Sequence, residues 1–283
     1  IRSSGGSFEP QSSSVPPARS RAQGPRCPPR RVICAMLSTL AKVACREAMA
    51  GLQPRCLAAV VGRVAARLPA SRMAMSTLSA PQMLCYQCEQ TSAGKGCVTQ
   101  GVCSKTPVIA GLQDLQMLYN LRLGQLAHAA GPGAPSQTAL HHLVLQSTFA
   151  TLTNVNFDDA YFEGTLRQSA DLVAELEAAL QGKAPPPPPG LPVALPSDRK
   201  ALLLASRPAG LLARGAIVND EDLFGVIEMA TYGMKGALAY FSHAEELLAG
   251  DTAYSQAERD EVYAEIFRIY AYLAGAGSSA SAG

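Results

Sequence analysis

The chain has 283 residues, 48% of them hydrophobic, which is enough to bury a sizeable core in one large or two ordinary domains. Its formal net charge of +2 is unevenly distributed, because residues 1–80 carry twelve of the 24 Lys and Arg but two of the 22 Asp and Glu. This basic front contains one aromatic residue, Phe8, and no recognisable nucleic-acid-binding motif, so we expect no nucleic-acid partner.

Residues 1–82 are typical of a targeting extension that is otherwise largely disordered, because they are rich in Arg and Ser and nearly free of acidic residues. Apolar residues recur at helical spacing between Leu57 and Leu68, with Arg63 and Arg67 on another face, as in an amphipathic targeting helix. Every apolar run is shorter than the roughly 18 residues needed to cross a bilayer, so we expect no membrane span.

The extension predicts import into a mitochondrion or a plastid, followed by its removal. Met36 is a candidate start of translation, because the sequence opens on Ile1. A start near Met73 to Met83 would instead omit the extension and leave the protein in the cytoplasm. The cysteines of the extension have no paired spacing and are expected to be incidental: Cys27, Cys34, Cys45 and Cys56.

Four further cysteines lie close together, and no cysteine follows them: Cys85, Cys88, Cys97 and Cys103. Four thiolates in the spacing C-x2-C-x8-C-x5-C suit a tetrahedral zinc ion or an iron-sulfur cluster, whereas an intracellular location disfavours a structural disulfide. Zinc sites usually present two C-x2-C pairs, and here the second pair is opened to five intervening residues. The spacing therefore favours a four-iron cluster, with zinc and a redox disulfide as alternatives.

Residues 83–184 are predicted to form the cysteine loop followed by a three-helix bundle. Apolar residues near a 3.6-residue period indicate helices over 108–130, 136–150 and 158–182. Pro107 suits the first turn of the first helix, Ser136 the cap of the second and Gly182 the end of the third.

Residues 185–198 contain five consecutive prolines and are predicted to be an extended linker, because proline fixes φ and lacks a donor. Residues 199–283 are predicted to form a second helical bundle, truncated at its C-terminal end. Its helices are expected from Asn219 or Asp220 to 250 and over 255–275, before regular structure is lost in the low-complexity residues 276–283. The predicted fold class is all-α, with two helical bundles around the cysteine loop.

Three segments resemble one known family, the hybrid-cluster or prismane proteins, also called hydroxylamine reductases. The segments are "MLCYQCEQTSAGKGCVTQGVCSKTPVIAGLQDLQ", "STFATLTNVNFD" and "YGMKGALAYFSHAEELLAG", in the family's order, and the resemblance covers residues 83–274. It implies that Cys85, Cys88, Cys97 and Cys103 bind a [4Fe-4S] cluster, since a longer-spaced subgroup is associated with [2Fe-2S].

The resemblance also implies a role in electron transfer. Members of the family are oxidoreductases that reduce hydroxylamine to ammonia, or nitric oxide to nitrous oxide, at a second, hybrid cluster bound by two later α/β domains. No cysteine follows Cys103, so we expect no hybrid cluster in this chain. The resemblance thus implies the family's electron-entry domain, which receives electrons from a ferredoxin-type or other low-potential donor and is not catalytically competent alone.

One alternative from another class remains, namely a zinc-stapled helical interaction module without redox activity, which metal content would distinguish. Lys105 and Arg122 are candidates for tuning a cluster, against the default of a solvated charge, and Asn154 and Asn156 are candidates for bracing its loop. The histidines are expected to be surface or hydrogen-bonded residues rather than metal ligands: His128, His141, His142 and His243.

Overall fold

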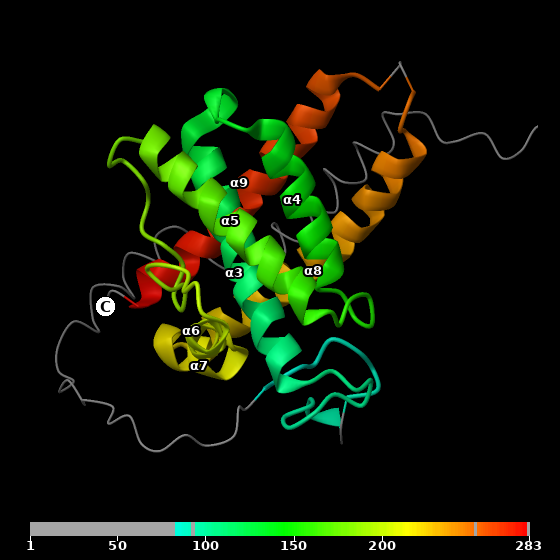
Figure 1. Ribbon diagram of the computed structural model, residues 1–283, viewed down its shortest axis with the longest axis vertical. Helices are drawn as coiled ribbons and strands as arrows, with labels where there is room; N and C mark the ends of the chain where they lie inside the picture. The colour runs from blue at the N-terminus through cyan, green and yellow to red at the C-terminus, as the bar shows by residue number, and fades with distance from the viewer. Residues whose placement is uncertain (1–82, 92–93, 252–253, 282–283) are drawn as a thin grey trace, which may run out of the picture.

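The described part of the chain is built from α-helices, which confirms the all-α prediction (Figure 1). The computed structural model describes residues 83–91, 94–251 and 254–281, so the predicted extension of residues 1–82 lies outside the described residues. Within these ranges the elements are α3 (Pro107–Ala130), η2 (Gly131–Gly133), α4 (Gln137–Ala150), α5 (Asp159–Ala179), α6 (Arg199–Ala205), η3 (Arg207–Ala209), α7 (Leu211–Val218), α8 (Glu221–Leu247) and α9 (Gln256–Ser281).

Helix α3 is the central helix of the fold. It begins as predicted with Pro107 in its first turn, where the Thr106 hydroxyl accepts a hydrogen bond from the Ile109 N–H at 3.3 Å. Every residue from Leu115 to Ala127 is buried, because α5 and α9 pack against the helix from different sides. The cysteine loop precedes α3 directly, so the start of this helix is a rigid support for the thiols.

Buried hydrogen bonds fix α3 relative to its neighbours. The Gln116 amide donates to the Ser169 hydroxyl of α5 at 2.9 Å, and the Asn120 amide donates to the Thr148 hydroxyl of α4 at 2.9 Å. Such fully satisfied polar groups in an apolar core favour a single packing arrangement, since any shift would leave a buried group without a partner.

The connection from α4 to α5 brings a turn toward the cysteine loop. Ser136 does not cap α4 as predicted, because its φ of 52° is left-handed and its hydroxyl donates to the Glu175 carboxylate at 2.9 Å instead. Asp158 caps α5 by accepting from the Ala160 N–H at 2.9 Å. Between the two helices, residues 151–157 form a turn in which Asn154 has a φ of 60°.

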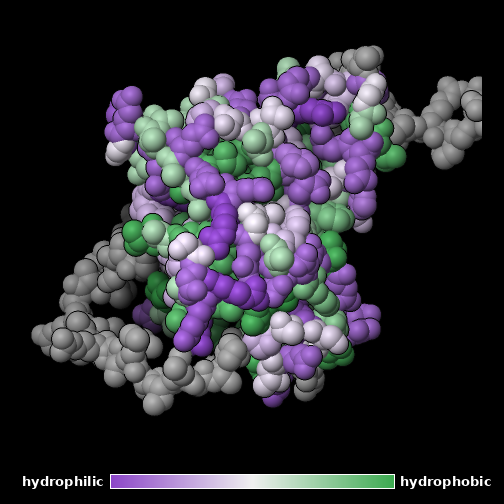
Figure 2. Space-filling model, viewed as in Figure 1, coloured by the Kyte–Doolittle hydropathy of each residue, from purple (hydrophilic) through white to green (hydrophobic). Residues whose placement is uncertain are grey.

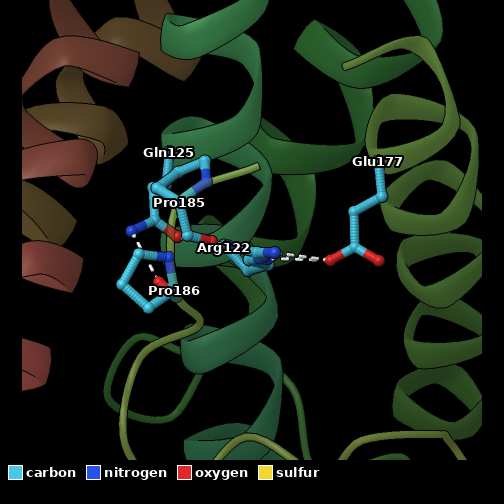
Figure 3. Close-up of polar contacts among 5 residues, drawn as sticks. All are labelled: Arg122, Gln125, Glu177, Pro185 and Pro186. Carbon is cyan, nitrogen blue, oxygen red and sulfur yellow. Dashed lines mark hydrogen bonds and ion pairs between the residues drawn. The ribbon is translucent and has the colours of Figure 1, made fainter. Parts of the chain in front are cut away.

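The proline-rich residues 185–198 contain no helix, as their composition predicts. Figure 3 shows how α3 holds this connector: Arg122 donates to the Pro185 carbonyl at 2.6 Å, and Gln125 donates to the Pro186 carbonyl at 3.0 Å. Arg122 also pairs with Glu177 of α5 at 2.5 Å. The connector is therefore held against α3, and the same arginine joins α3 to α5.

Two short helices, α6 and α7, were not predicted. Each is at most eight residues long, which is too short to show a clear apolar period, and Pro208 and Gly210 interrupt the sequence between them. The longer α8 begins as predicted, because the Asp220 side chain accepts from the Leu223 N–H at 2.9 Å. Helix α9 continues to Ser281, so regular helix extends through most of the predicted low-complexity end, whose proline-free Ala and Ser residues permit it.

One hydrophobic core joins the helices before and after the connector. It combines residues of α3, α4 and α5, such as Leu123, Val144 and Phe162, with residues of α8 and α9, such as Phe241 and Tyr270. The face seen in Figure 2 is covered largely by hydrophilic residues, with apolar residues visible between them. The two predicted bundles thus share their buried surface.

No single helix within the described ranges is both long enough and apolar enough to span a membrane. Helices α6 with η3 and α7, which meet at 50°, would satisfy length and composition as a bent pair.

Candidate metal centre

The cysteine loop folds back on itself before α3 begins. Cys85 and Cys97 exchange two backbone hydrogen bonds, of 3.0 Å and 2.8 Å, and the Met83 N–H donates to the Val98 carbonyl at 3.2 Å. A second turn is closed by the Gly101 N–H, which donates to the Lys105 carbonyl at 2.8 Å. These contacts bring the first and third cysteines side by side despite the residues between them.

Two glycines lie at tight points of this loop. Gly96 has a φ of 105°, and a Cβ there would lie 2.8 Å from the Leu84 Cδ1 and 3.3 Å from the Cys85 carbonyl oxygen. At Gly101 a Cβ would lie 3.0 Å from the Cys103 Sγ. The loop is therefore tightly folded at both glycines, and at Gly101 the backbone lies close to a thiol.

All four predicted cysteines line one cavity. Their thiols are free, with Cys97 buried and Cys85, Cys88 and Cys103 partly exposed. The cavity is open in part to solvent, and its other lining residues are Gln87, Thr91, Gly101, Val102, Lys105, Thr153 and Asn154. The last two belong to the turn between α4 and α5, beside the loop in Figure 1.

The four cysteines line a common cavity but are not gathered around one point that could hold an ion. Within the described ranges no three His, Cys, Asp or Glu side chains are placed to hold one metal ion. A single zinc ion would need four donors, each about 2.3 Å from it when the donor is sulfur. As placed in the described residues, the four thiols share a cavity but do not form the donor shell of one ion.

Lys105 is the charged group next to the thiols. It is 3% exposed, and its ammonium lies 3.9 Å from the Cys85 Sγ and donates to the side-chain amide oxygen of Gln113 at 2.6 Å. Gln113 in turn donates to the backbone carbonyl of Asn156 at 3.0 Å. In the part of the chain that the structure describes, no carboxylate lies within ion-pair distance of Lys105.

A second, charged cavity adjoins the first and shares Cys85, Gln87 and Lys105 with it. It lies between the cysteine loop and helices α3, α7 and α8, and Arg214 and Glu228 form a buried ion pair in its wall. With the Gln87 amide oriented to satisfy both neighbours, its oxygen accepts from the Lys235 ammonium at 3.0 Å.

Asp114 also faces the charged cavity and makes no hydrogen bond or ion pair with the described residues. Burial raises the pKa of Asp114 to about 7, although Arg214 and Lys235 act in the opposite direction. Burial likewise lowers the pKa of Lys235 below its usual range, against the attraction of Asp114. The walls of the charged cavity thus carry three cationic side chains, Lys105 among them, and two acidic ones, of which Asp114 is readily protonated.

The chain was also compared with known protein families and curated proteins. A model of the Prismane/CO dehydrogenase family matches residues 83–270, a range that includes the cysteine loop and helices α3 to α8. The chain belongs to this family. Within this prismane chain the match begins at Met83, directly before the first of the four clustered cysteines.

Several curated relatives are named hydroxylamine reductase. The protein of Zymomonas mobilis is 37% identical over 170 residues, which cover 58% of this chain and 30% of the relative. The protein of Rhodospirillum rubrum is 36% identical (58% and 31% covered), and that of Acetivibrio thermocellus is 35% identical (58% and 29%). The prismane chain therefore spans about a third of the length of these relatives.

Of the weaker candidates, Asn154 lines the cysteine cavity, and Asn156 contacts Gln113 of α3 through its backbone carbonyl, whereas Arg122 lies apart from the cysteine loop. Arg122 lies nine residues beyond Gln113 on α3, roughly 13 Å along the helix axis, and binds Glu177 and the connector. His141 is buried, stacks on Tyr263 at 3.9 Å between ring centroids and has a pKa lowered by burial.

The charged cavity was missed by sequence reasoning. Its members are spread over α3, α7 and α8: Asp114, Arg214, Glu228 and Lys235. A usable signal exists for Lys235, which falls in the apolar stripe of α8 between Met234 and Leu238, where a solvated lysine is not expected.

Proposed function

We propose that this chain is an iron-sulfur redox protein whose four clustered cysteines bind a [4Fe-4S] cluster and pass single electrons. One observation carries the proposal: four free thiols, which fall within 19 residues of the sequence, line one cavity. When bound, such a cluster supplies one-electron transfer. Family membership supports a redox role, because the matched relatives are named hydroxylamine reductase.

The electrostatics beside the thiols support the same proposal. Metal-binding cysteines are deprotonated, and a cluster with four thiolate ligands carries net negative charge. An isolated buried cation is costly, and Lys105 has no carboxylate partner within the described residues. An anionic group bound by the thiols would supply the missing negative charge at the position that Lys105 faces.

Residues of three kinds would hold the cluster: ligands, glycines of the loop, and residues that close the cavity. Cys85, Cys88, Cys97 and Cys103 would ligate it, and Gly96 and Gly101 allow the backbone to approach. Thr153 and Asn154 close one side of the cavity. Together they would restrict the access of water and fix the thiols before an electron arrives.

We further propose that the chain acts as an electron-entry unit for substrate reduction performed elsewhere. The relatives are named for hydroxylamine reduction, and the chain spans about a third of their length. The donor would be a ferredoxin-type or other low-potential protein, and residues 1–82 would direct the chain to a mitochondrion or plastid.

Anaerobic reconstitution tests this function. We expect the full chain to take up about four irons and four sulfides, to accept one electron from a ferredoxin-type donor and to show no hydroxylamine reduction. Cys97→Ser should lose most of the iron and part of the helical signal, because binding orders the loop. Cys56→Ser, in the extension, is the matched control and should bind as much iron as the wild type.

Two results would contradict the proposal. Stoichiometric zinc without iron would replace it with the zinc-stapled interaction module. Hydroxylamine turnover by the reconstituted chain, lost in Cys88→Ser and absent from an iron-sulfide control, would show a substrate site within this chain.

A further inference from the structure

We propose that the buried Lys105 ammonium sets the reduction potential of the cysteine-bound centre, by stabilising its more negative, reduced form. The inference deepens the proposed function and rests on it. Lys105 is a positioning and tuning residue in this scheme, and it is neither a metal ligand nor a proton donor.

The geometry singles out Lys105 among the buried cations. Its ammonium lies 3.9 Å from the Cys85 Sγ, whereas Arg214 is paired with Glu228 and Arg122 with Glu177. Lys235 donates to the Gln87 side chain. Lys105 alone among these four contacts a thiol and lacks a carboxylate partner in the described part of the chain, so its charge is not neutralised locally.

The position of Lys105 is fixed by residues outside the cysteine loop. Gln113 of α3 accepts a hydrogen bond from the ammonium at 2.6 Å, and Gln113 is held by the Asn156 carbonyl of the turn before α5. A lysine side chain in water would lose much of its effect through rotation and screening. Here both are suppressed, because the side chain is 3% exposed and its partner lies on a rigid helix.

The direction of the effect follows from charge. Reduction adds one electron, supplied by an external low-potential donor, and therefore one negative charge, with no bond broken and no proton required. A cation at fixed distance attracts the reduced form more than the oxidised form, and a hydrogen bond to a ligand sulfur acts in the same sense. Removing the charge of Lys105 should therefore lower the potential.

The nearby acids do not cancel this effect. Glu228 is neutralised by Arg214, and Asp114 has Lys235 and Arg214 as its strongest cationic influences, with Lys105 a weaker one. The two acidic side chains of the charged cavity therefore do not neutralise the positive charge of Lys105 next to Cys85.

The test compares reconstituted variants in an anaerobic redox titration monitored by electron paramagnetic resonance. In Lys105→Gln, which keeps a hydrogen-bonding side chain but no charge, the ratio of reduced to oxidised centre at a fixed ambient potential should fall about tenfold, or about 59 mV for a one-electron couple. Lys105→Arg should retain most of the wild-type value. Lys95→Gln removes an exposed charge from the same loop and should change the ratio much less, because water screens it.

The outcomes separate this inference from the proposed function. If the wild type binds no iron, the proposed function fails and this inference fails with it. If the variants carry full iron but Lys105→Gln titrates like the wild type, this inference alone is wrong. Equal shifts in Lys105→Gln and Lys105→Arg would also contradict it, because they would indicate loosened packing instead of a charge effect. If Lys105→Gln binds less iron than the wild type, its potential is not a clean measure of the lost charge. The second variant is then Gln113→Met, which removes the amide that holds the ammonium. The inference stands only if Gln113→Met lowers the reduction potential.

Discussion

At the scale of single residues, the prominent feature is the concentration of buried charge beside the cysteines. Three cationic side chains there are each less than 10% exposed: Lys105, Lys235 and Arg214. Lys105 contacts the Cys85 thiol and the Gln113 amide, Lys235 contacts the Gln87 amide, and Arg214 pairs with the Glu228 carboxylate. Burying these ionisable groups lowers the stability of the folded protein, and such groups are typically concentrated at functional sites. A bound anionic centre gives a physical reason for retaining them.

Asp114 allows the cost of one such charge to be measured. Burial raises its pKa from 3.8 to about 7, so the folded chain holds a proton that the unfolded chain releases between about pH 4 and pH 7. Its contribution therefore becomes less favourable as pH rises through this range. We predict that Asp114→Asn stabilises the protein above pH 7 by up to roughly 4 kcal/mol, with the difference vanishing near pH 4.

Thermal melting at several pH values checks this prediction. The control is Asp171→Asn on α5, where the carboxylate is exposed and its loss should change stability by no more than about 0.5 kcal/mol at any pH. A lower melting temperature for Asp114→Asn at pH 8 would show that attraction to Lys235 and Arg214 exceeds the cost of burial.

At the scale of the helices, the fold depends on the close approach of α9 to α3. Gly124 of α3 faces Tyr270 of α9, which is fully buried and whose hydroxyl lies 3.3 Å from the Thr148 hydroxyl of α4. A Cβ at Gly124 would lie 2.5 Å from the Tyr270 Cβ, an atom that cannot move without its helix. A single glycine thus determines how near the last helix comes to the central one.

We therefore predict opposite effects for the same substitution in two helices. Gly124→Ala should destabilise the protein by about 1–3 kcal/mol through overpacking. Gly164→Ala in α5 has no atom within 4 Å of the new Cβ and should stabilise it by about 0.5–1 kcal/mol, because alanine loses less conformational freedom in a helix. Denaturant unfolding of both variants measures the difference, and a neutral Gly124→Ala would mean that α9 moves away from α3 at little cost.

At the scale of the whole molecule, charge divides the chain into two parts. The first 80 residues carry twelve of the basic and two of the acidic residues, while the remaining part, which includes all described helices, is net acidic. Such an asymmetry is typical of a targeting segment in front of a folded protein.

We predict that residues 36–80 direct a fluorescent passenger to a mitochondrion or plastid in a eukaryotic cell, because an amphipathic arginine helix suits import. The matched control replaces Arg63 and Arg67 by Glu and should leave the passenger in the cytosol. A passenger that stays cytosolic with the natural residues would refute the targeting role.

Much of the fold could be predicted from the sequence, because the features concerned are local. The 3.6-residue period identified α3, α4, α5, α8 and α9, and Pro107 and Asp220 marked two of their beginnings. The spacing of the four cysteines was equally visible, and the tertiary structure places all of them on one cavity. Periodicity and spacing depend only on residues that are near one another along the chain, so both can be read from the sequence without knowing the fold.

Other features were decided only by the tertiary structure. Helices α6 and α7 are too short to show a period, and they are fixed by packing against α3, α8 and α9. Neither the charge state of Asp114 nor the exposure of Lys105 could be read from the sequence, because each depends on groups that are distant along the chain. The sequence by itself determined a helical protein with four grouped thiols. Folding decided which charges surround them, because burial and electrostatic interaction act through space and not along the chain.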